Sequence, residues 1–332
     1  MWHVPSCLWL LSLGSTVFAA HALTISITSS PFVVWDSLDS KCEKHIPGGK
    51  PGKPAIDLPD TPVNAFSDDG GTVHLVSADT TSRISTGSSL LRTTRNCSIV
   101  MNSTLSPDPA LYATDEFLDG TWAFPNGTVY SLLHVEYPGM NFGRCDGNGT
   151  TYPYCWTVAM TLSVSHDWGR SWQHARAPPD HMVAAPPYRY HGSATTPNAG
   201  WGDSSGITRS PTDGFYYSIA HNRFAEGLQG NGSCVMRTRD ISNPRSWRGW
   251  GGETLGFSVV FASPYAATVP SYDPSQHICQ PLDFPNCVVM GGKQTYGGLP
   301  PHSLSLSLSL SLSLSLSLLS LSLSLSLSLS LN

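Results

Sequence analysis

The chain has 332 residues, of which 12% are charged, and a formal net charge of -5 at pH 7. Lys and Arg together number 18 against 23 Asp and Glu, so no basic excess indicates a nucleic-acid partner. With 30 glycines, 26 prolines, 10 tryptophans and 12 tyrosines, the composition is typical of an all-β domain rich in turns.

The first segment of the chain has the features of a secretory signal. Residues 1–22 contain an apolar run too short to span a bilayer, and Ala20-His21-Ala22 supplies a small-x-small cleavage pattern. The residues before the apolar run include no Lys or Arg, which is weak for a signal. We predict that the mature protein is secreted and extracellular.

The last segment is of low complexity. Residues 303–331 alternate Ser and Leu almost without interruption, as a translated CT repeat does. We interpret 302–332 as a disordered tail or a gene-model artefact. A membrane anchor is the alternative, but Ser occupies every second position and strict period two gives no apolar helical face. Residues 23–301 then form one large domain, with 23–62 as an irregular lead-in.

Seven cysteines follow the predicted signal, which suits an oxidising compartment. Cys145 and Cys155 flank a Gly-Asn-Gly stretch and are predicted to form a disulfide. The partners of the others are left open, and an odd number leaves one thiol free or its partner missing. The five sequons predict glycosylation in exposed loops, at Asn96, Asn102, Asn126, Asn148 and Asn231.

Two β-rich runs joined by a glycine turn recur through the middle of the chain. Strands are expected at 72–76, 128–133 and 215–219, each after a Gly-Gly, Asn-Gly or Asp-Gly turn. The turns lie about 40 to 60 residues apart, the size of a four-stranded propeller blade. A sandwich also gives hairpins, but not this wide repeat. We predict an all-β fold, a β-propeller of five or six blades with an incomplete last blade.

One segment, SHDWGRSW at 165–172, has the residues of a specific hairpin turn. Ser165 and Asp167 can cap backbone N–H groups, Gly169 can take a positive φ, and Trp172 is expected to be buried between strands. With Ser171 these positions match S-x-D-x-G-x-[ST]-W, the Asp-box. On this motif the chain resembles the sialidase-like β-propellers, in which the Asp-box is structural, so the resemblance implies a fold and not catalysis.

Further segments resemble an uncharacterised secreted propeller group related to sialidases and five-bladed glycosidases. They are DTPVNAF at 60–66, LHVEY at 133–137, CW at 155–156, PYRY at 187–190, DGFYY at 213–217, and CVMRTRD at 234–240 running on to SWR at 246–248. The resemblance spans about residues 60–279 and implies the fold more firmly than an activity. The chain lacks the Phe-Arg-Ile-Pro segment of sialidases and has NAFS at 64–67 in that place. Cleavage of sialic acid is therefore not expected.

Acidic residues are the candidates for chemistry, because glycoside cleavage requires two carboxyl groups flanking the bond. Asp60 resembles the first-blade acid of five-bladed glycosidases, Glu136 lies in an apolar strand, and Asp203 lies in a Gly-rich loop. These three are predicted to be catalytic, with a turn or structural role as the alternative for each. Asp115 and Glu116 precede an inner strand and are interpreted as solvent-exposed.

Four further residues are predicted to bind the substrate. His134 alternates with Glu136 along one strand, so both point the same way, as a site pair or as a structural hydrogen bond. Arg189 and Arg237 can hold an anion, although Arg237 shares a face with Arg239 and a solvated strand is the alternative. Trp201, like Tyr188 and Tyr190, can stack on a sugar ring or belong to the core.

No metal site and no cofactor are predicted. His181, His191 and His221 have no ligand spacing, and no phosphate-binding or dinucleotide motif occurs. The sequence therefore predicts a secreted propeller acting on a glycan or glycoprotein, a glycoside hydrolase if it is an enzyme. The alternatives are a non-catalytic glycan- or protein-binding propeller and an inactive truncated product. No membrane contact is expected, and the oligomeric state is left open.

Overall fold

The computed structural model describes residues 42, 59–79, 81–146, 155–193, 200–223, 232–266 and 273–282. The predicted signal, most of the lead-in and the Ser-Leu tail lie outside these residues, as do Asn148, Asn231 and Cys287. The described part is β-structure with four short 3-10 helices: η1 (Pro109–Leu111), η2 (Gly139–Phe142), η3 (Pro244–Ser246) and η4 (Pro274–His277). Among the described residues, no helix has the length and apolar character needed to cross a membrane.

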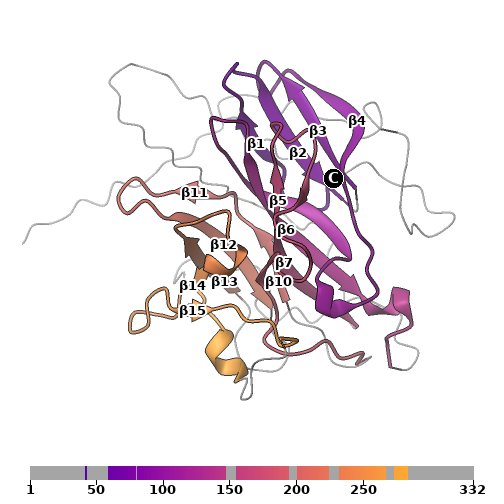
Figure 1. Ribbon diagram of the computed structural model, residues 1–332, viewed down its shortest axis with the longest axis vertical. Helices are drawn as coiled ribbons and strands as arrows, with labels where there is room; N and C mark the ends of the chain where they lie inside the picture. The colour runs from indigo at the N-terminus through magenta and orange to yellow at the C-terminus, as the bar shows by residue number, and fades with distance from the viewer. Residues whose placement is uncertain are drawn as a thin grey trace, which may run out of the picture. The chain divides into compact units, whose positions relative to one another are not determined.

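The first sheet has four antiparallel strands in sequence order (Figure 1). They are β1 (Asn64–Ser67), β2 (Val73–Ala78), β3 (Thr81–Gly87) and β4 (Thr93–Asn102). The turn between β1 and β2 is closed by Asp68, whose carboxylate accepts the Thr72 N–H at 2.7 Å. Gly71 takes a φ of +79° there, a conformation that glycine adopts without steric cost.

The second group repeats this arrangement. It contains β5 (Asp115–Ala123), β6 (Val129–Pro138), β7 (Trp156–Ser165) and β8 (Gln173–His174), paired antiparallel in that order, with β9 (Met182–Ala184) also on β7. Strands β1, β2 and β3 contact β5, the first strand of this group.

The third group contains β10 (Gly200–Ser204), β12 (Tyr216–Arg223), β13 (Gly232–Thr238), β14 (Arg248–Gly249) and β15 (Val259–Val260), with β11 (Thr208–Arg209) on β12. One parallel pair, Gly200 with Val158, joins β10 to β7. Runs of four antiparallel strands in sequence order are the blades of a β-propeller. The predicted all-β, propeller-type fold is therefore confirmed, and the expected strands 72–76, 128–133 and 215–219 lie in β2, β6 and β12. The blade number and the incomplete last blade remain predictions.

Two apolar clusters lie between successive groups of strands. One joins the first two groups and includes Val76, Ile84, Leu118, Leu133 and Trp172. The other joins the second and third and includes Leu132, Leu162, Trp201, Met236 and Trp247. Because alternate residues of β6 enter different clusters, its two faces are both buried over this stretch, as period-two geometry requires of a middle strand between two blades.

The turn at 165–172 has the hydrogen bonds that its residue types suggest. Ser165 Oγ accepts the Gly169 N–H at 2.8 Å, and the Asp167 carboxylate accepts the Ser171 N–H at 2.9 Å and its hydroxyl at 2.6 Å. Gly169 has a φ of +78°, and the Trp172 indole donates to Gly169 O at 3.0 Å. Trp172 belongs to the cluster between the first two groups, so this segment ties one group to the next.

Replacing Asp167 with alanine is expected to destabilise the fold by about 2 kcal/mol, because two donors of Ser171 lose their acceptor. Partial burial acts to raise the pKa of Asp167, but the hydrogen bonds from Ser171 and Ser165 together outweigh it, so the pKa is lowered. Its contribution to stability is thus present above the ordinary value of 3.8 and is lost as the pH falls through the lowered value. Urea unfolding at pH 7 measures the effect. A loss no larger than that of exposed Asp69→Ala contradicts it.

Three disulfides join described cysteines: Cys42 with Cys97, Cys145 with Cys155, and Cys234 with Cys279. The second is the pairing suggested by the short loop between those cysteines. Disulfides persist in oxidising compartments, so this set agrees with an extracellular location.

The described sequons are exposed, but two of them are not in loops. Asn126 lies in the β5–β6 turn, where its side chain accepts the Thr128 N–H at 3.1 Å. Asn96 and Asn102 lie in β4 instead, on a sheet surface open to solvent. The expectation of loops is wrong for these two, because β4 is a long strand with one solvated face. Glycosylation itself remains a prediction.

Candidate active site

The pairing of β5 with β6 gathers polar side chains on one sheet face. Asp115 is directly opposite Glu136, and Phe117 is opposite His134. Residues directly opposite in an antiparallel pair share a face, and alternate residues along a strand do too. Asp115, His134 and Glu136 therefore lie together, whereas Glu116 points to the other face.

His134 is the centre of this group. Its Nε2 lies 3.1 Å from Glu136 Oε1, so the predicted same-face arrangement of the two residues is confirmed. The backbone N–H of Asp203 donates to Nδ1 at 3.2 Å, and the Asp203 carboxylate is 3.9 Å from Nδ1. In this arrangement the proton of His134 is on Nε2, directed at Glu136.

Burial lowers the pKa of His134, but the hydrogen bond and the charge of Glu136 outweigh it and, with Asp203 and Asp119, raise the pKa to about 9. The Asp203 N–H opposes this rise, because a protonated Nδ1 cannot accept it. For His134 to bind a second proton, at Nδ1, the hydrogen bond from the Asp203 backbone N–H must break. The Asp203 carboxylate would then accept the new proton's hydrogen bond.

Asp203 is not in a loop, as the Gly-rich sequence suggested, but in β10 at a β-bulge. Its φ is +47°, which is strained for a residue with a side chain. A Cβ on the neighbouring Gly202 would lie 2.6 Å from the His134 ring, so only glycine permits β10 to approach so closely. The bulge turns the Asp203 carboxylate outward, where it is 61% exposed.

Two more carboxyl groups face the group around His134. Asp60 is solvent-exposed before β1, and its pKa is raised by partial burial and by the charges of Glu136, Asp79 and Asp203. Asp115 is half-buried, and burial, then Glu136, raises its pKa to about 7. The solvated role expected for Asp115 is therefore wrong, because the strand places it beside another acid.

Asp119, a fully buried acid, also interacts with His134. Asp119 is in the bulge of β5, and its Oδ2 accepts the N–H and the hydroxyl of Ser204 at 2.5 and 2.7 Å. Burial raises its pKa to about 7 against the effect of these bonds and of His134. Asp119 thus fixes β10 next to β5, which positions Asp203.

Of the predicted substrate-binding residues other than His134, two are held by the protein itself. Trp201 is fully buried in the core with its ring centroid 4.9 Å from that of Phe261, so the stacking role on a sugar is wrong. Arg237 lies 4.0 and 4.2 Å from the ring centroids of Phe215 and Phe257 and 3.6 Å from the Asp213 carboxylate. Among the described residues, no contact connects Arg237 to the acids around His134.

A pocket lies on the other face of β6 and β7. Its lining includes five tyrosine rings: Tyr112, Tyr137, Tyr188, Tyr190 and Tyr265. The hydroxyls of Tyr137 and Tyr190 donate to the carbonyls of Pro107 and Arg144, at 2.9 and 2.8 Å. Arg189 is exposed beside it, with its Nε donating to Pro264 O at 3.2 Å. The cavity between these rings is about 20 Å³, which is room for a water molecule and not for a sugar ring.

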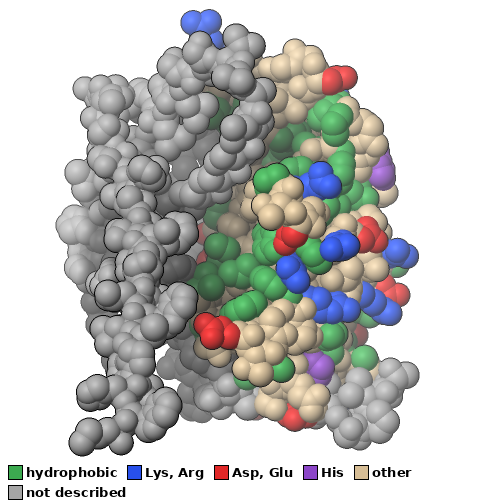
Figure 2. Space-filling view, turned by 90° about the vertical axis from the view of Figure 1, so that its left-hand side faces the viewer, with side chains coloured by type: hydrophobic (Ala, Val, Ile, Leu, Met, Phe, Trp, Pro, Cys, Tyr) green, Lys and Arg blue, Asp and Glu red, His purple; other side chains and the backbone are tan. Residues whose placement is uncertain are grey.

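Charged groups are mixed on the described surface. Figure 2 shows blue Lys and Arg side chains close to red Asp and Glu side chains on the described part of one face. Mixed charge of this kind does not form the basic stripe of a nucleic-acid interface.

Comparison with known proteins gives structural likeness only. No family model and no curated protein match the chain. Solved structures that match include an endo-arabinase from Bacteroides thetaiotaomicron (9% identity, 55% of this chain and 51% of that one, TM-score 0.33). Others are a sucrose-6-phosphate hydrolase from Lactobacillus gasseri (13%, 57% and 33%, 0.36) and the Hadza microbial sialidase Hz136 (12%, 51% and 33%, 0.27). The chain covers about half of these structures or less, and such low TM-scores do not carry an activity to it.

Proposed function

We propose that this protein is a secreted glycoside hydrolase whose reacting carboxyl groups are Glu136 and Asp115. Glu136 acts as the carboxylate that attacks the sugar or activates water, and Asp115 acts as the proton donor. The observation that carries the proposal is the position of Asp115 directly opposite Glu136, which His134 holds and next to which Asp203 and Asp60 lie. A carboxyl group with a pKa of about 7 beside a second carboxyl group suits a general acid.

His134 and the exposed acids have supporting roles. His134 holds Glu136 through its Nε2, which fixes the carboxylate in one rotamer. Asp60 and Asp203 are exposed and can accept hydrogen bonds from sugar hydroxyls. The sequence analysis predicted Asp60 and Asp203 to be reacting acids. In this proposal Asp115 is the reacting acid instead.

The charge of the group favours a neutral sugar. The carboxylates of Glu136 and Asp203 beside His134 disfavour a substrate carboxylate. Of the two predicted guanidinium groups, Arg237 is held by Asp213, and Arg189 donates to Pro264 O. We therefore propose neutral glycans as the substrate class.

The test is release of reducing sugar by the full chain, purified from the medium of a secretory host. The panel contains neutral furanose and pyranose polysaccharides and sialylated glycans. Hydrolysis of at least one neutral glycan, with none of sialylated linkages, is expected. Hydrolysis of sialylated linkages alone, or binding of glycans with no hydrolysis across the panel, contradicts the proposal.

The alkaline limb of the activity profile is expected to fall near pH 7, because Asp115 loses its proton there. Asp115→Asn is expected to lower the hydrolysis rate by about 100-fold or more, a typical size for general acid catalysis, and to remove this limb. Initial rates of both forms between pH 4 and pH 9 measure it, on substrates with good and poor leaving groups. A variant that retains the wild-type limb assigns the proton donor elsewhere.

Glycan binding without hydrolysis is the second candidate function. It is favoured by the partly exposed rings of Tyr188 and Tyr190, because aromatic rings stack on sugars. In that case calorimetric binding to a glycan survives Glu136→Gln and is weakened by Tyr188→Ala. Glu136 is on one face of β6, and Tyr188 belongs to the pocket on the other face, so the two functions are separable.

A further inference from the structure

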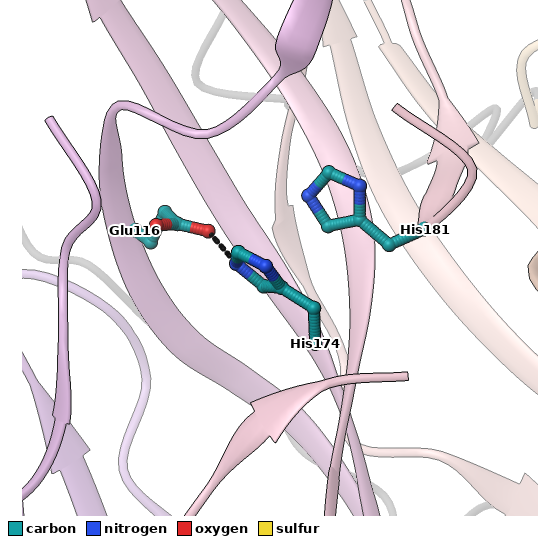
Figure 3. A group of neighbouring side chains, drawn as sticks. All are labelled: Glu116, His174 and His181. Carbon is teal, nitrogen blue, oxygen red and sulfur yellow. Dashed lines mark hydrogen bonds and ion pairs between the residues drawn. The ribbon is translucent and has the colours of Figure 1, made fainter. Parts of the chain in front are cut away.

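Three potential metal ligands converge from segments that are distant in sequence (Figure 3). Glu116 lies on β5, His174 on β8, and His181 between β8 and β9. One donor atom from each lies within 4.8 Å of the other two. Figure 3 shows the Glu116 carboxylate directed at the His174 ring, with His181 next to that ring.

The carboxylate of Glu116 is buried and fixed. Its Oε2 accepts the backbone N–H of Thr104 at 2.7 Å, and its Oε1 lies 2.5 Å from His174 Nε2. The expectation of a solvated Glu116 is thus wrong. A buried carboxylate held by one backbone donor, with its other oxygen facing an imidazole, is an oriented ligand.

His181 is the feature that points to a missing ligand. The residue is fully buried, and neither ring nitrogen forms a hydrogen bond with any described residue. Backbone groups of Tyr112 and Pro179 lie near the ring, but neither forms a hydrogen bond with it. Its ring centroid is 4.4 Å from that of His174. Buried polar side chains normally have a partner, so both ring nitrogens are available to a ligand that the described residues do not supply.

We propose that Glu116, His174 and His181 bind a divalent transition-metal ion, for which Zn²⁺ is the best match. Two imidazoles and one carboxylate are a typical zinc ligand set that leaves the fourth position to water. Donors around tetrahedral zinc lie about 3.4 Å apart at ordinary bond lengths. His174 Nε2 and Glu116 Oε1, now 2.5 Å apart, would separate by about 1 Å, and His181, within 4.8 Å of both, would approach by a similar amount. Ca²⁺ and Mg²⁺ prefer oxygen ligands and fit less well.

The contact between Glu116 and His174 agrees with metal binding. His174 Nε2 and Glu116 Oε1 face each other, so an ion bound to both would replace the hydrogen bond that they now form. Only His174 of the three is partly exposed, which gives the ion its route of entry.

The site is separate from the proposed hydrolase residues. Glu116 is opposite Val135, and Val135 is opposite Ala159, on the sheet face away from Asp115 and Glu136. Val135 and Ala159 also line the tyrosine pocket, so the ion would lie beside that pocket. An ion here joins β5, β8 and the segment after β8, and it stabilises the folded chain by mass action.

The test uses the full chain after dialysis against EDTA. Zn²⁺ titration by calorimetry should give one ion per chain, and thermal unfolding should shift upward with added Zn²⁺. Co²⁺ should give visible absorption bands without a sulfur charge-transfer band, which distinguishes this site from one made by cysteine thiolates. A wild-type chain that binds neither ion at micromolar concentration overturns the proposal without any variant.

Variants then assign the ligands. His181→Ala and His174→Ala should each weaken Zn²⁺ affinity by about 100-fold or more, since loss of a ligand exceeds the 10- to 100-fold typical of an outer-shell partner. His166→Ala, which removes an exposed histidine from a turn, should leave affinity unchanged. Should His181→Ala fail to fold, His174→Gln is the second variant, because its side chain is partly exposed and its amide can still donate to Glu116. Equal affinity in wild type and His174→Ala places the ion elsewhere.

Discussion

Glu136→Gln is expected to lower glycan hydrolysis by about 1,000-fold, because the amide can neither attack the sugar nor take a proton from water. The variant should fold normally. Its amide oxygen still accepts the proton of His134 Nε2, the bond that now spans 3.1 Å. The rate of reducing-sugar release on the neutral glycan identified in the panel measures the loss.

The matched control is Glu253→Gln, the same substitution at an exposed glutamate. It should leave hydrolysis unchanged. Binding of the glycan to Glu136→Gln should persist within a few-fold, because the substitution removes chemistry and not contact area. If Glu136→Gln hydrolyses the glycan at the wild-type rate, the reacting carboxylate is another residue.

The part of the site that follows from local pattern was predictable. Along β6 the sequence alternates, so His134 and Glu136 had to share a face, and a carboxylate in an apolar strand needs a partner. The hairpins were equally local: Asn-Gly and Asp-Gly turns start β6 and β12 where expected. Period-two geometry and turn chemistry act over a few residues, which is why they can be read without coordinates.

Burial of single residues was less predictable. Trp201 stands between two glycines, a context that suits an exposed loop, yet β10 runs beside β7 and the ring enters the core. Asp203 was placed in a loop for the same reason. The bulge that exposes it depends on Ser204 bonding Asp119, a contact 85 residues apart in sequence that no local signal indicates.

The group of Glu116, His174 and His181 could not be found from spacing. Glu116 and His174 are 58 residues apart, and their contact exists because β5 and β8 belong to one four-stranded group. Only one feature of the sequence pointed to this group. Glu116 follows Asp115 in a strand, so the two side chains must lie on opposite faces of the sheet. The face of Glu116 is apolar, and a buried carboxylate requires a ligand or a partner there.

The stability of the wild-type protein is expected to fall by several kcal/mol between about pH 4 and pH 8, with Asp119 as a main cause. Burial raises the pKa of Asp119 to about 7, whereas the unfolded chain has its ordinary value of 3.8. Between these values the folded state holds a proton that the unfolded state has lost, so its stability declines as the pH rises. A shift of this size corresponds to about 4 kcal/mol at most.

Asp119→Asn is expected to remove that share of the pH dependence, because the amide does not titrate and its oxygen still accepts from Ser204. Urea unfolding from pH 4.5 to pH 8.5 measures it, with exposed Asp69→Asn as the control that should keep the wild-type slope. Asp115 also has a raised pKa of about 7, so part of the slope should remain. The double variant Asp115→Asn/Asp119→Asn should lose the fall that the two carboxyl groups cause between pH 4.5 and pH 7. Above pH 6.5 a fall should remain, because the pKa of His134 is raised to about 9 in the folded state. A wild-type slope in Asp119→Asn would mean that this carboxyl ionises in the fold as it does in the unfolded chain.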